Sequence, residues 1–303
     1  MNKHSSITAK AALIGLLTLP AAALAQPSFG GHYPIGVEGI KGGSLPPPGF
    51  YIRDYNLFYF ADELKNPNGD SVGDLDLFAY AQAFRPVWIT NLKLLGGYYG
   101  MDVLVPFILT DFSLKMPSGP PSDCSFGLGD IFIEPITLSW HWQQADLGVG
   151  YGFWVPTGHQ TFGAPAKPGK GFWSHMFTLG GTWYPDVEKT WSVSLLNRYE
   201  IHMEHEDIDI TPGNTFSLEL GIGKAVTPTL ELGLAGYYQT QTTEDGGVPW
   251  RSKELDHVFG IGPEVVVAFP KCALFVSLRY AREFSAEDRP EGNTATLTLT
   301  KKF

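Results

Sequence analysis

The stretch that decides the fold is Asn293-Thr-Ala-Thr-Leu-Thr-Leu-Thr-Lys-Lys-Phe303 at the carboxyl terminus. Its apolar and polar side chains alternate. Because successive side chains of a β-strand point to opposite faces, Ala295, Leu297 and Leu299 share one face and the threonines share the other. The backbone groups of a final strand need a partner. We expect this strand to pair with the first strand and to close a barrel whose apolar face meets lipid.

The amino terminus has the pattern of an export signal. Basic residues within the first ten positions precede the apolar run 11–19, and small residues occupy Ala23-Leu24-Ala25. The run is too short to cross a bilayer as a helix, and Pro20 follows it. We therefore expect residues 1–25 to be a signal peptide, cleaved after Ala25, that directs the chain to the outer membrane of a Gram-negative cell.

The composition of the remaining chain favours strands as the membrane-crossing elements. No apolar run after residue 25 is long enough for a transmembrane helix. Glycine (35), phenylalanine (20) and tyrosine (13) are plentiful, whereas lysine and arginine together number 21, which suits a barrel with aromatic girdles. The net charge of −10 and the absence of a basic cluster argue against a nucleic-acid partner.

Segments with a period of two recur along the chain, and helical periodicity is absent. The sequence predicts an all-β fold: a transmembrane antiparallel up-and-down barrel of about 12 strands over residues 49–303. The predicted strands lie near 49–61, 75–89, 92–107, 129–142, 145–156, 174–184, 190–202, 214–226, 229–241, 257–269, 272–284 and 293–303.

The connections between these segments alternate between long and short, as in outer-membrane barrels with long external loops and tight periplasmic turns. The longest predicted loops are 62–74, 108–128, 157–173 and 242–256. Cys124 falls in an external loop and Cys272 at the periplasmic rim, so we expect no disulfide between them. One strand, around residue 134, fits badly, and a bulge at Glu134-Pro135 would turn Glu134 inward.

The inward-facing residues of a barrel set its selectivity. On this register the predicted lumen-lining charges are Asp54, Asp102, Glu134, Arg198, Glu200, Glu219, Glu231, Glu264, Arg279 and Glu283. The excess of carboxylates favours cations or neutral solutes over anions. A structural ion pair in the wall is the alternative role for each of these charges. Twelve strands predict a narrow lumen, between those of eight-stranded barrels and of open porins.

The segment 26–48 has too many glycines and prolines for a strand and too many apolar residues for a solvated tail. We expect it to plug the lumen, and a loose periplasmic segment is the alternative. Aromatic side chains on this segment or on inward positions are the predicted ligand contacts: Phe29, Tyr33, Phe50, Phe58 and Trp154.

Several motifs resemble one known family. They are His32-Tyr-Pro-Ile-Gly-Val-Glu-Gly-Ile40, Gly43-Ser-Leu-Pro-Pro-Pro-Gly-Phe-Tyr51, Gly127-Leu-Gly-Asp-Ile-Phe-Ile-Glu-Pro135 and Val155-Pro-Thr-Gly158. The chain is similar to the exported proteins of the meta-pathway phenol degradation family. The resemblance implies an outer-membrane barrel that takes up hydrophobic or aromatic compounds. It supplies no catalytic residues, and we do not expect an enzyme.

Other functions need different residues. A lipid hydrolase would need a serine and a histidine within hydrogen-bond reach on the lipid face, and no such pair is evident. The run His202-Met-Glu-His-Glu-Asp-Ile-Asp209 is better explained as an acidic loop among lipopolysaccharide head groups than as a metal site. We expect no cofactor, no metal and a monomer in contact with outer-membrane lipid. A structural or adhesive barrel with a sealed lumen is the main alternative to a channel.

Overall fold

The computed structural model describes residues 30–115, 122–160, 164–247 and 255–303. These residues form thirteen β-strands and one short 3-10 helix, η1 (Pro270–Cys272). The strands are β1 (Gly49–Lys65), β2 (Ser71–Leu94), β3 (Gly97–Lys115), β4 (Ser122–Leu128), β5 (Ile131–His141), β6 (Ala145–Val155), β7 (Ser174–Trp183), β8 (Trp191–His202), β9 (Thr215–Thr227), β10 (Leu230–Gln241), β11 (His257–Phe269), β12 (Leu274–Glu287) and β13 (Pro290–Lys302). No helix in the described part of the chain is long and apolar enough to span a bilayer.

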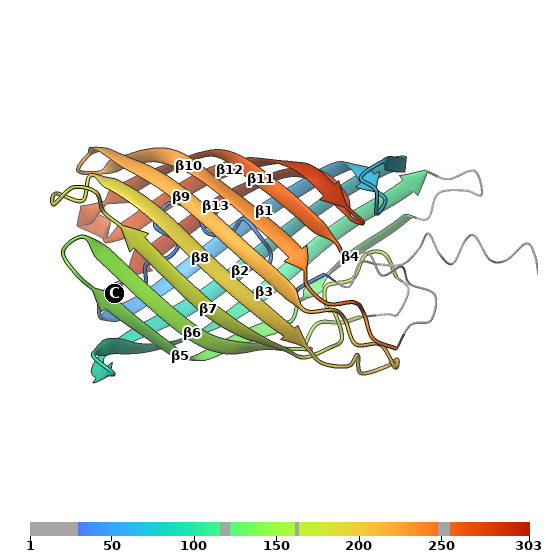
Figure 1. Cartoon of the computed structure of the whole chain (residues 1–303), viewed down its shortest axis with the longest axis horizontal. Coiled ribbons are helices and arrows are strands. Elements are labelled where there is room, and N and C mark those ends of the chain that lie inside the picture. The colour runs from blue at the N-terminus through green and yellow to red at the C-terminus, as the bar shows by residue number, and fades with distance from the viewer. Residues whose placement is uncertain (1–29, 116–121, 161–163, 248–254) are drawn as a thin grey trace, which may run out of the picture.

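The strands close into an antiparallel barrel (Figure 1). β1 pairs with β2 on one side and with β13 on the other, from Tyr51↔Lys302 to Leu64↔Pro290. The pairing between the first and last strands confirms the predicted closure. β4 and β5 both pair with β3, along different halves of it, so twelve strands complete the wall and β4 is an extra one.

The sequence pattern of β8 shows why these segments form a membrane-type wall. Ser192, Ser194, Arg198 and Glu200 are buried inside the barrel, whereas the alternate positions Trp191, Val193, Leu195 and Ile201 are apolar and exposed on the outside. The same arrangement recurs around the barrel, with exposed Trp183, Val193, Leu195, Leu220, Ile222, Leu234, Ile261, Leu278 and Phe284. A polar interior and an apolar exterior are the reverse of a soluble protein and fit a barrel in lipid.

One end of the barrel carries the long connections and is here called the long-loop end. At this end several strands are longer than the sequence predicted. The predicted loop 62–74 is reduced to residues 66–70, and β3 and β4 occupy most of 108–128. In this extension Ala61, Leu75 and Leu114 are buried together inside, while Asp74 and Asp76 are exposed outside. In this extension the apolar side chains therefore face the interior and the polar ones face outward, the reverse of the membrane-type wall. A prediction based on apolar residues outside does not extend to it.

Two smaller predictions are confirmed. The pairing of β5 with β6 shifts between Ile133 and Ile136, which is the expected bulge, and Glu134 is buried. Cys124 and Cys272 are both free and exposed, so no disulfide joins them, although Cys124 lies in β4 rather than in a loop.

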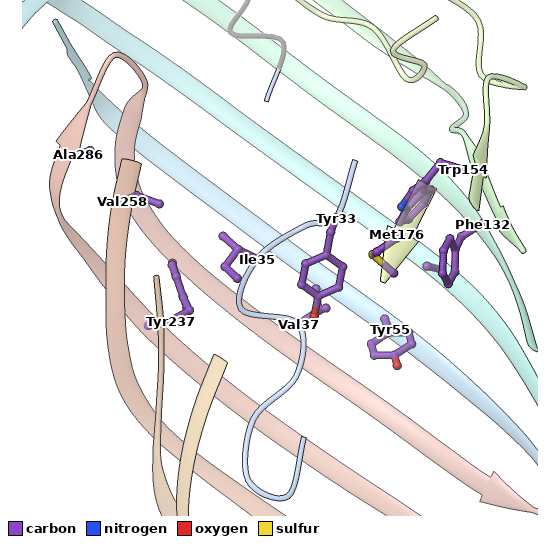
Figure 2. Packing of buried hydrophobic residues seen from close by; sticks show 12 residues of the cluster. Tyr33, Ile35, Val37, Tyr55, Phe132, Trp154, Met176, Tyr237, Val258 and Ala286 are labelled. Carbon is purple, nitrogen blue, oxygen red and sulfur yellow. The ribbon is translucent and has the colours of Figure 1, made fainter. Parts of the chain in front are cut away.

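Residues 30–48, here called the inner segment, lie inside the barrel (Figure 2). Near the long-loop end, Lys170 Nζ donates a hydrogen bond to the carbonyl of Gly30 at 2.7 Å. Near the opposite, short-turn end, Tyr51 OH donates to the carbonyl of Pro47 at 2.8 Å. Between them Tyr33, Ile35 and Val37 pack with wall residues that include Phe132, Trp154, Met176 and Tyr237. The segment thus extends along the lumen before it enters β1.

Candidate functional site

The wall carboxylates hold the inner segment by its backbone. Glu219 accepts hydrogen bonds from the N–H groups of Gly36 and Glu38, both at 3.0 Å, and from Tyr33 OH at 2.5 Å. Glu200 accepts from the N–H groups of His32 and Tyr33 at 3.1–3.2 Å. A segment without a strand partner leaves its N–H groups to be satisfied by side chains. These two carboxylates supply the acceptors.

Further down the lumen the contacts continue along β8 to β12. Glu264 accepts from the N–H of Ile40 at 2.7 Å and pairs with Arg279, whose guanidinium donates to the carbonyl of Gly36 at 2.6 Å. Lys41 pairs with Glu231 at 2.7 Å. Several charges of the wall therefore bind the inner segment.

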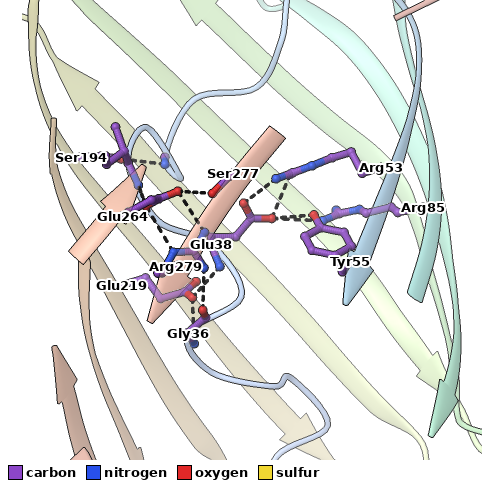
Figure 3. A network of polar contacts seen from close by, with 12 residues as sticks. Gly36, Glu38, Arg53, Tyr55, Arg85, Ser194, Glu219, Glu264, Ser277 and Arg279 are labelled. Atoms are coloured by element: carbon purple, nitrogen blue, oxygen red, sulfur yellow. Dashed lines mark hydrogen bonds and ion pairs between the residues drawn. The ribbon is translucent and has the colours of Figure 1, made fainter. Parts of the chain in front are cut away.

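Glu38 ties the segment to the opposite wall (Figure 3). Its carboxylate accepts two hydrogen bonds from the Arg53 guanidinium, at 2.9 and 2.8 Å, and one from Tyr55 OH at 2.7 Å. Arg85 lies 4.0 Å from the same carboxylate and also pairs with Asp102 and Glu134. Glu38 therefore joins β1, β2, β3 and β5 to the inner segment through one ion-pair network.

An apolar cavity of about 120 Å³ lies between the inner segment and the wall. The segment contributes Tyr33, Pro34 and Val37 to its lining, and the wall contributes Tyr55, Leu57, Ala81, Ala83, Leu104, Phe132, Trp154 and Met176. Charged side chains also line it, among them Asp130, Lys170 and Arg198. In a lumen lined mainly by polar groups, this cavity offers an apolar solute a place to lie.

A second, larger cavity of about 540 Å³ opens toward the short-turn end. Its lining is rich in charged groups, including Lys41, Arg53, Asp146 and Lys189. Glu38, Arg85 and Arg198 line both cavities. The Glu38 network therefore lies between the apolar cavity and the larger cavity with charged lining residues.

The loop before β7 completes the long-loop end of the site. The N–H of Lys170 donates to Asp130 at 2.8 Å, and its ammonium group reaches Gly30. Burial lowers the pKa of Lys170 from its ordinary 10.5 to about 8, although nearby carboxylates oppose this change.

The structure places nine of the ten predicted lumen charges on the inner face: Asp102, Glu134, Arg198, Glu200, Glu219, Glu231, Glu264, Arg279 and Glu283. The prediction for Asp54 is wrong. Asp54 lies opposite Leu299 and Phe84 on the outer face, where Gln82 donates a hydrogen bond to it at 3.3 Å. β1 carries polar residues on both faces, so the alternation of polarity did not identify which face is inside.

The predicted ligand-contacting aromatics divide in the same way. Tyr33 and Trp154 line the apolar cavity. Phe50 and Phe58 share the outer face with Asp54, and their predicted inward orientation is wrong; Phe50 is 42% exposed and packs on Phe303. Phe29 lies outside the described residues.

Sequence reasoning missed Arg53 and Arg85, which face inward, and the role of Glu38. The wrong phase in β1 hid Arg53. The pattern Tyr51-Ile-Arg-Asp-Tyr55 allows either Arg53 or Asp54 to face inward. The expected position of Glu38 within the lumen was the one observation that favoured Arg53, because a buried carboxylate needs a cationic partner.

Comparisons with known proteins agree with the fold. A family model described as "Putative MetA-pathway of phenol degradation" matches residues 61–299. The structure is similar to the COG4313 outer membrane channel from Pseudomonas putida F1, with a TM-score of 0.72, 16% identity and coverage of 89% of this chain and 99% of that one. It also resembles the β domain of the Bordetella autotransporter BrkA, with a TM-score of 0.53, 12% identity and coverage of 85% and 100%. No curated protein matches in sequence.

Proposed function

The chain belongs to the "Putative MetA-pathway of phenol degradation" family, and we propose that it is an outer-membrane channel for the passive uptake of small hydrophobic or aromatic compounds. We further propose that a signal peptide, residues 1–25, is removed on export, that the protein acts as a monomer, and that the long-loop end faces outward among lipopolysaccharide head groups. Transport of this kind needs neither a cofactor nor a catalytic residue.

The apolar cavity is the observation that carries the proposal. Its volume of about 120 Å³ is comparable to the roughly 150 Å³ apolar cavity that stays dry and binds benzene in an engineered protein. Tyr33 and Trp154 line it, and aromatic side chains favour offset-stacked or edge-on contact with an aromatic ring. A molecule the size of a phenol matches this cavity in volume and in polarity.

The inner segment acts as a plug in this proposal. A solute enters at the long-loop end, rests in the apolar cavity, passes the Glu38 network and leaves through the larger cavity toward the periplasm. Passage requires the contacts of Glu38 with Arg53 and Tyr55 to open, at least transiently. The ion pairs of the remaining wall charges keep the barrel rigid while the segment moves.

Uptake of radiolabelled phenol or toluene into liposomes that contain the purified protein tests this function. Ala83→Phe fills the apolar cavity and should reduce the uptake severalfold, whereas Ala295→Phe adds the same bulk on the outer face, opposite Phe58, and should leave uptake unchanged. Deletion of residues 26–48 should raise the ion conductance in planar bilayers. A sealed, structural or adhesive barrel would show no flux even after this deletion, and that result would refute the channel.

A further inference from the structure

Three buried side chains converge where the inner segment begins. They are His32 from the segment and Glu200 and His202 from β8, and one potential ligand atom of each lies within 4.8 Å of the others. The exposed fractions of the three residues are 8%, 1% and 4%. Two imidazoles and a carboxylate are a typical zinc-binding set.

The two imidazole rings point toward a common position. His32 Nδ1 and His202 Nδ1 lie 2.8 and 2.6 Å from Ser174 Oγ, which sits between them. Because one hydroxyl has a single proton, it can donate to one ring and accept from the other. Displacement of this hydroxyl, or its retention as a further ligand, would present both Nδ1 atoms to a cation.

The other nitrogen of each ring is held by an oxygen. His32 Nε2 lies 3.1 Å from the carboxylate of Asp130, and His202 Nε2 lies 3.2 Å from Thr215 Oγ1. Asp130 is itself fixed by the N–H groups of Gly158 and Lys170, at 2.9 and 2.8 Å. Metal-binding histidines characteristically donate their second N–H to a carboxylate or another oxygen, which sets the tautomer and the ring orientation. This outer arrangement is already in place.

No cationic side chain forms a direct ion pair with Glu200 among the described residues. Lys170, which interacts electrostatically with both Glu200 and Asp130, donates its ammonium hydrogen bond to the carbonyl of Gly30, and Lys167 lies near Asp130. The nearest guanidinium along β8, Arg198, pairs with Glu219 at 3.1 Å. Within the described residues no lysine or arginine lies within 4.0 Å of Glu200. Glu200 Oε2 accepts a hydrogen bond from the N–H of Tyr33 and has a second lone pair that can bind a divalent ion.

We propose that His32, His202 and Glu200 bind a divalent transition metal, Zn²⁺ or Cu²⁺, which fastens the start of the inner segment to the barrel wall. Bonds of 2.0–2.2 Å in a tetrahedral site place ligand atoms roughly 3.3 Å apart, so the present separations, which are within 4.8 Å, would shorten by up to about 1.5 Å. Imidazole nitrogens bind Zn²⁺ or Cu²⁺ in preference to Mg²⁺ and Ca²⁺, which prefer oxygen ligands. The metal site stands apart from the uptake function, since it is defined by binding alone.

Direct binding to the full-length mature protein in detergent tests the site. After treatment with EDTA, titration calorimetry with ZnCl₂ should show one site per chain, and CuCl₂ should give an electron paramagnetic resonance spectrum with nitrogen hyperfine coupling. Cu²⁺ should also quench the fluorescence of Trp154, whose ring stacks on His32 with centroids 5.5 Å apart. The difference in quenching between the parent protein and Trp154→Phe gives the contribution of Trp154.

Variants separate the site from adventitious binding. His32→Ala and His202→Ala should each lower the Zn²⁺ affinity at least a hundredfold, and Thr215→Val, which removes the oxygen behind His202, should lower it about tenfold or more. His141→Ala is the matched control, because His141 also faces a carboxylate, that of Asp146 at 3.0 Å, but lies near the short-turn end. His202→Gln is an additional test if the alanine variant fails to fold.

The proposal is overturned if the EDTA-treated protein binds no Zn²⁺ at micromolar concentrations, or if the His32 and His202 variants bind it as tightly as the parent protein. Neither result bears on solute uptake. Conversely, a barrel that binds the metal but passes no solute would keep this site and refute the channel.

Discussion

Replacement of Glu38 by glutamine should release the inner segment from β1. The substitution keeps the size of the side chain and removes the charge that holds Arg53 and faces Arg85. Breaking a buried ion pair by removing one partner typically costs about 3–5 kcal/mol. The Arg53 side chain is 28% exposed, so solvent compensates in part, and the low end of this range, about 3 kcal/mol, is appropriate.

This cost changes the population of the displaced segment. At about 1.4 kcal/mol for each factor of ten, a loss of about 3 kcal/mol shifts the ratio of displaced to docked segment by roughly a hundredfold. Ion conductance in planar bilayers should therefore show more frequent or longer openings. Protease digestion or hydrogen exchange of the segment should show the same change without a membrane.

Glu231→Gln provides the comparison. Its partner Lys41 is 34% exposed, and a pair of this kind contributes about 0–1 kcal/mol, so the openings should change less than about fivefold. Wild-type conductance and unchanged protection of the segment in Glu38→Gln would refute the assignment of Glu38 as the principal tie between the segment and β1.

Other changes test separate parts of the structure. Gly43→Ala should weaken docking of the segment and raise conductance, because the added Cβ would lie 2.4–2.5 Å from backbone atoms of Gly181 and Leu195; unchanged conductance would contradict this contact. Trp154→Ala should lower the free energy of unfolding in urea by about 3 kcal/mol and slow the uptake of aromatic solutes, and retention of both would argue against the cavity. The lowered pKa of Lys170, about 8, means that the unfolded chain binds its proton more readily between pH 8 and 10.5, so the melting temperature should rise across that window. Lys170→Met should abolish this rise, and an equal rise in the variant would refute it.

The wall of the barrel could be predicted from the sequence because lipid imposes a strict alternation on every strand. Leu218, Leu220 and Ile222 of β9, for example, alternate with Glu219 and two glycines. The prediction failed where this constraint is absent. In β1, hydrogen bonds such as that from Gln82 to Asp54 satisfy polar groups on the outer face, so polarity no longer identifies the inside.

The contacts of the inner segment could not be predicted, because a segment rich in glycine and proline has no periodicity. His32 and Ser174 are 142 positions apart, and Tyr33 and Glu219 are 186 apart. Nothing in the local sequence relates them. Only the closed barrel, which brings β7 to β12 around the segment, makes them neighbours.

β4 indicates where the lipid ends. It pairs with β3 along one edge, and within the described residues its other edge has no ladder partner. Unsatisfied backbone groups are not tolerated in hydrocarbon, so the acyl chains at the long-loop end must stop near Gly129, where β4 meets β5. β2, with 24 residues, is far longer than the 9–11 residues that cross a bilayer. At the long-loop end the β1–β2 and β3–β4 hairpins therefore extend beyond the bilayer, and in the proposed orientation a solute would first meet the protein at this extended rim, outside the acyl chains.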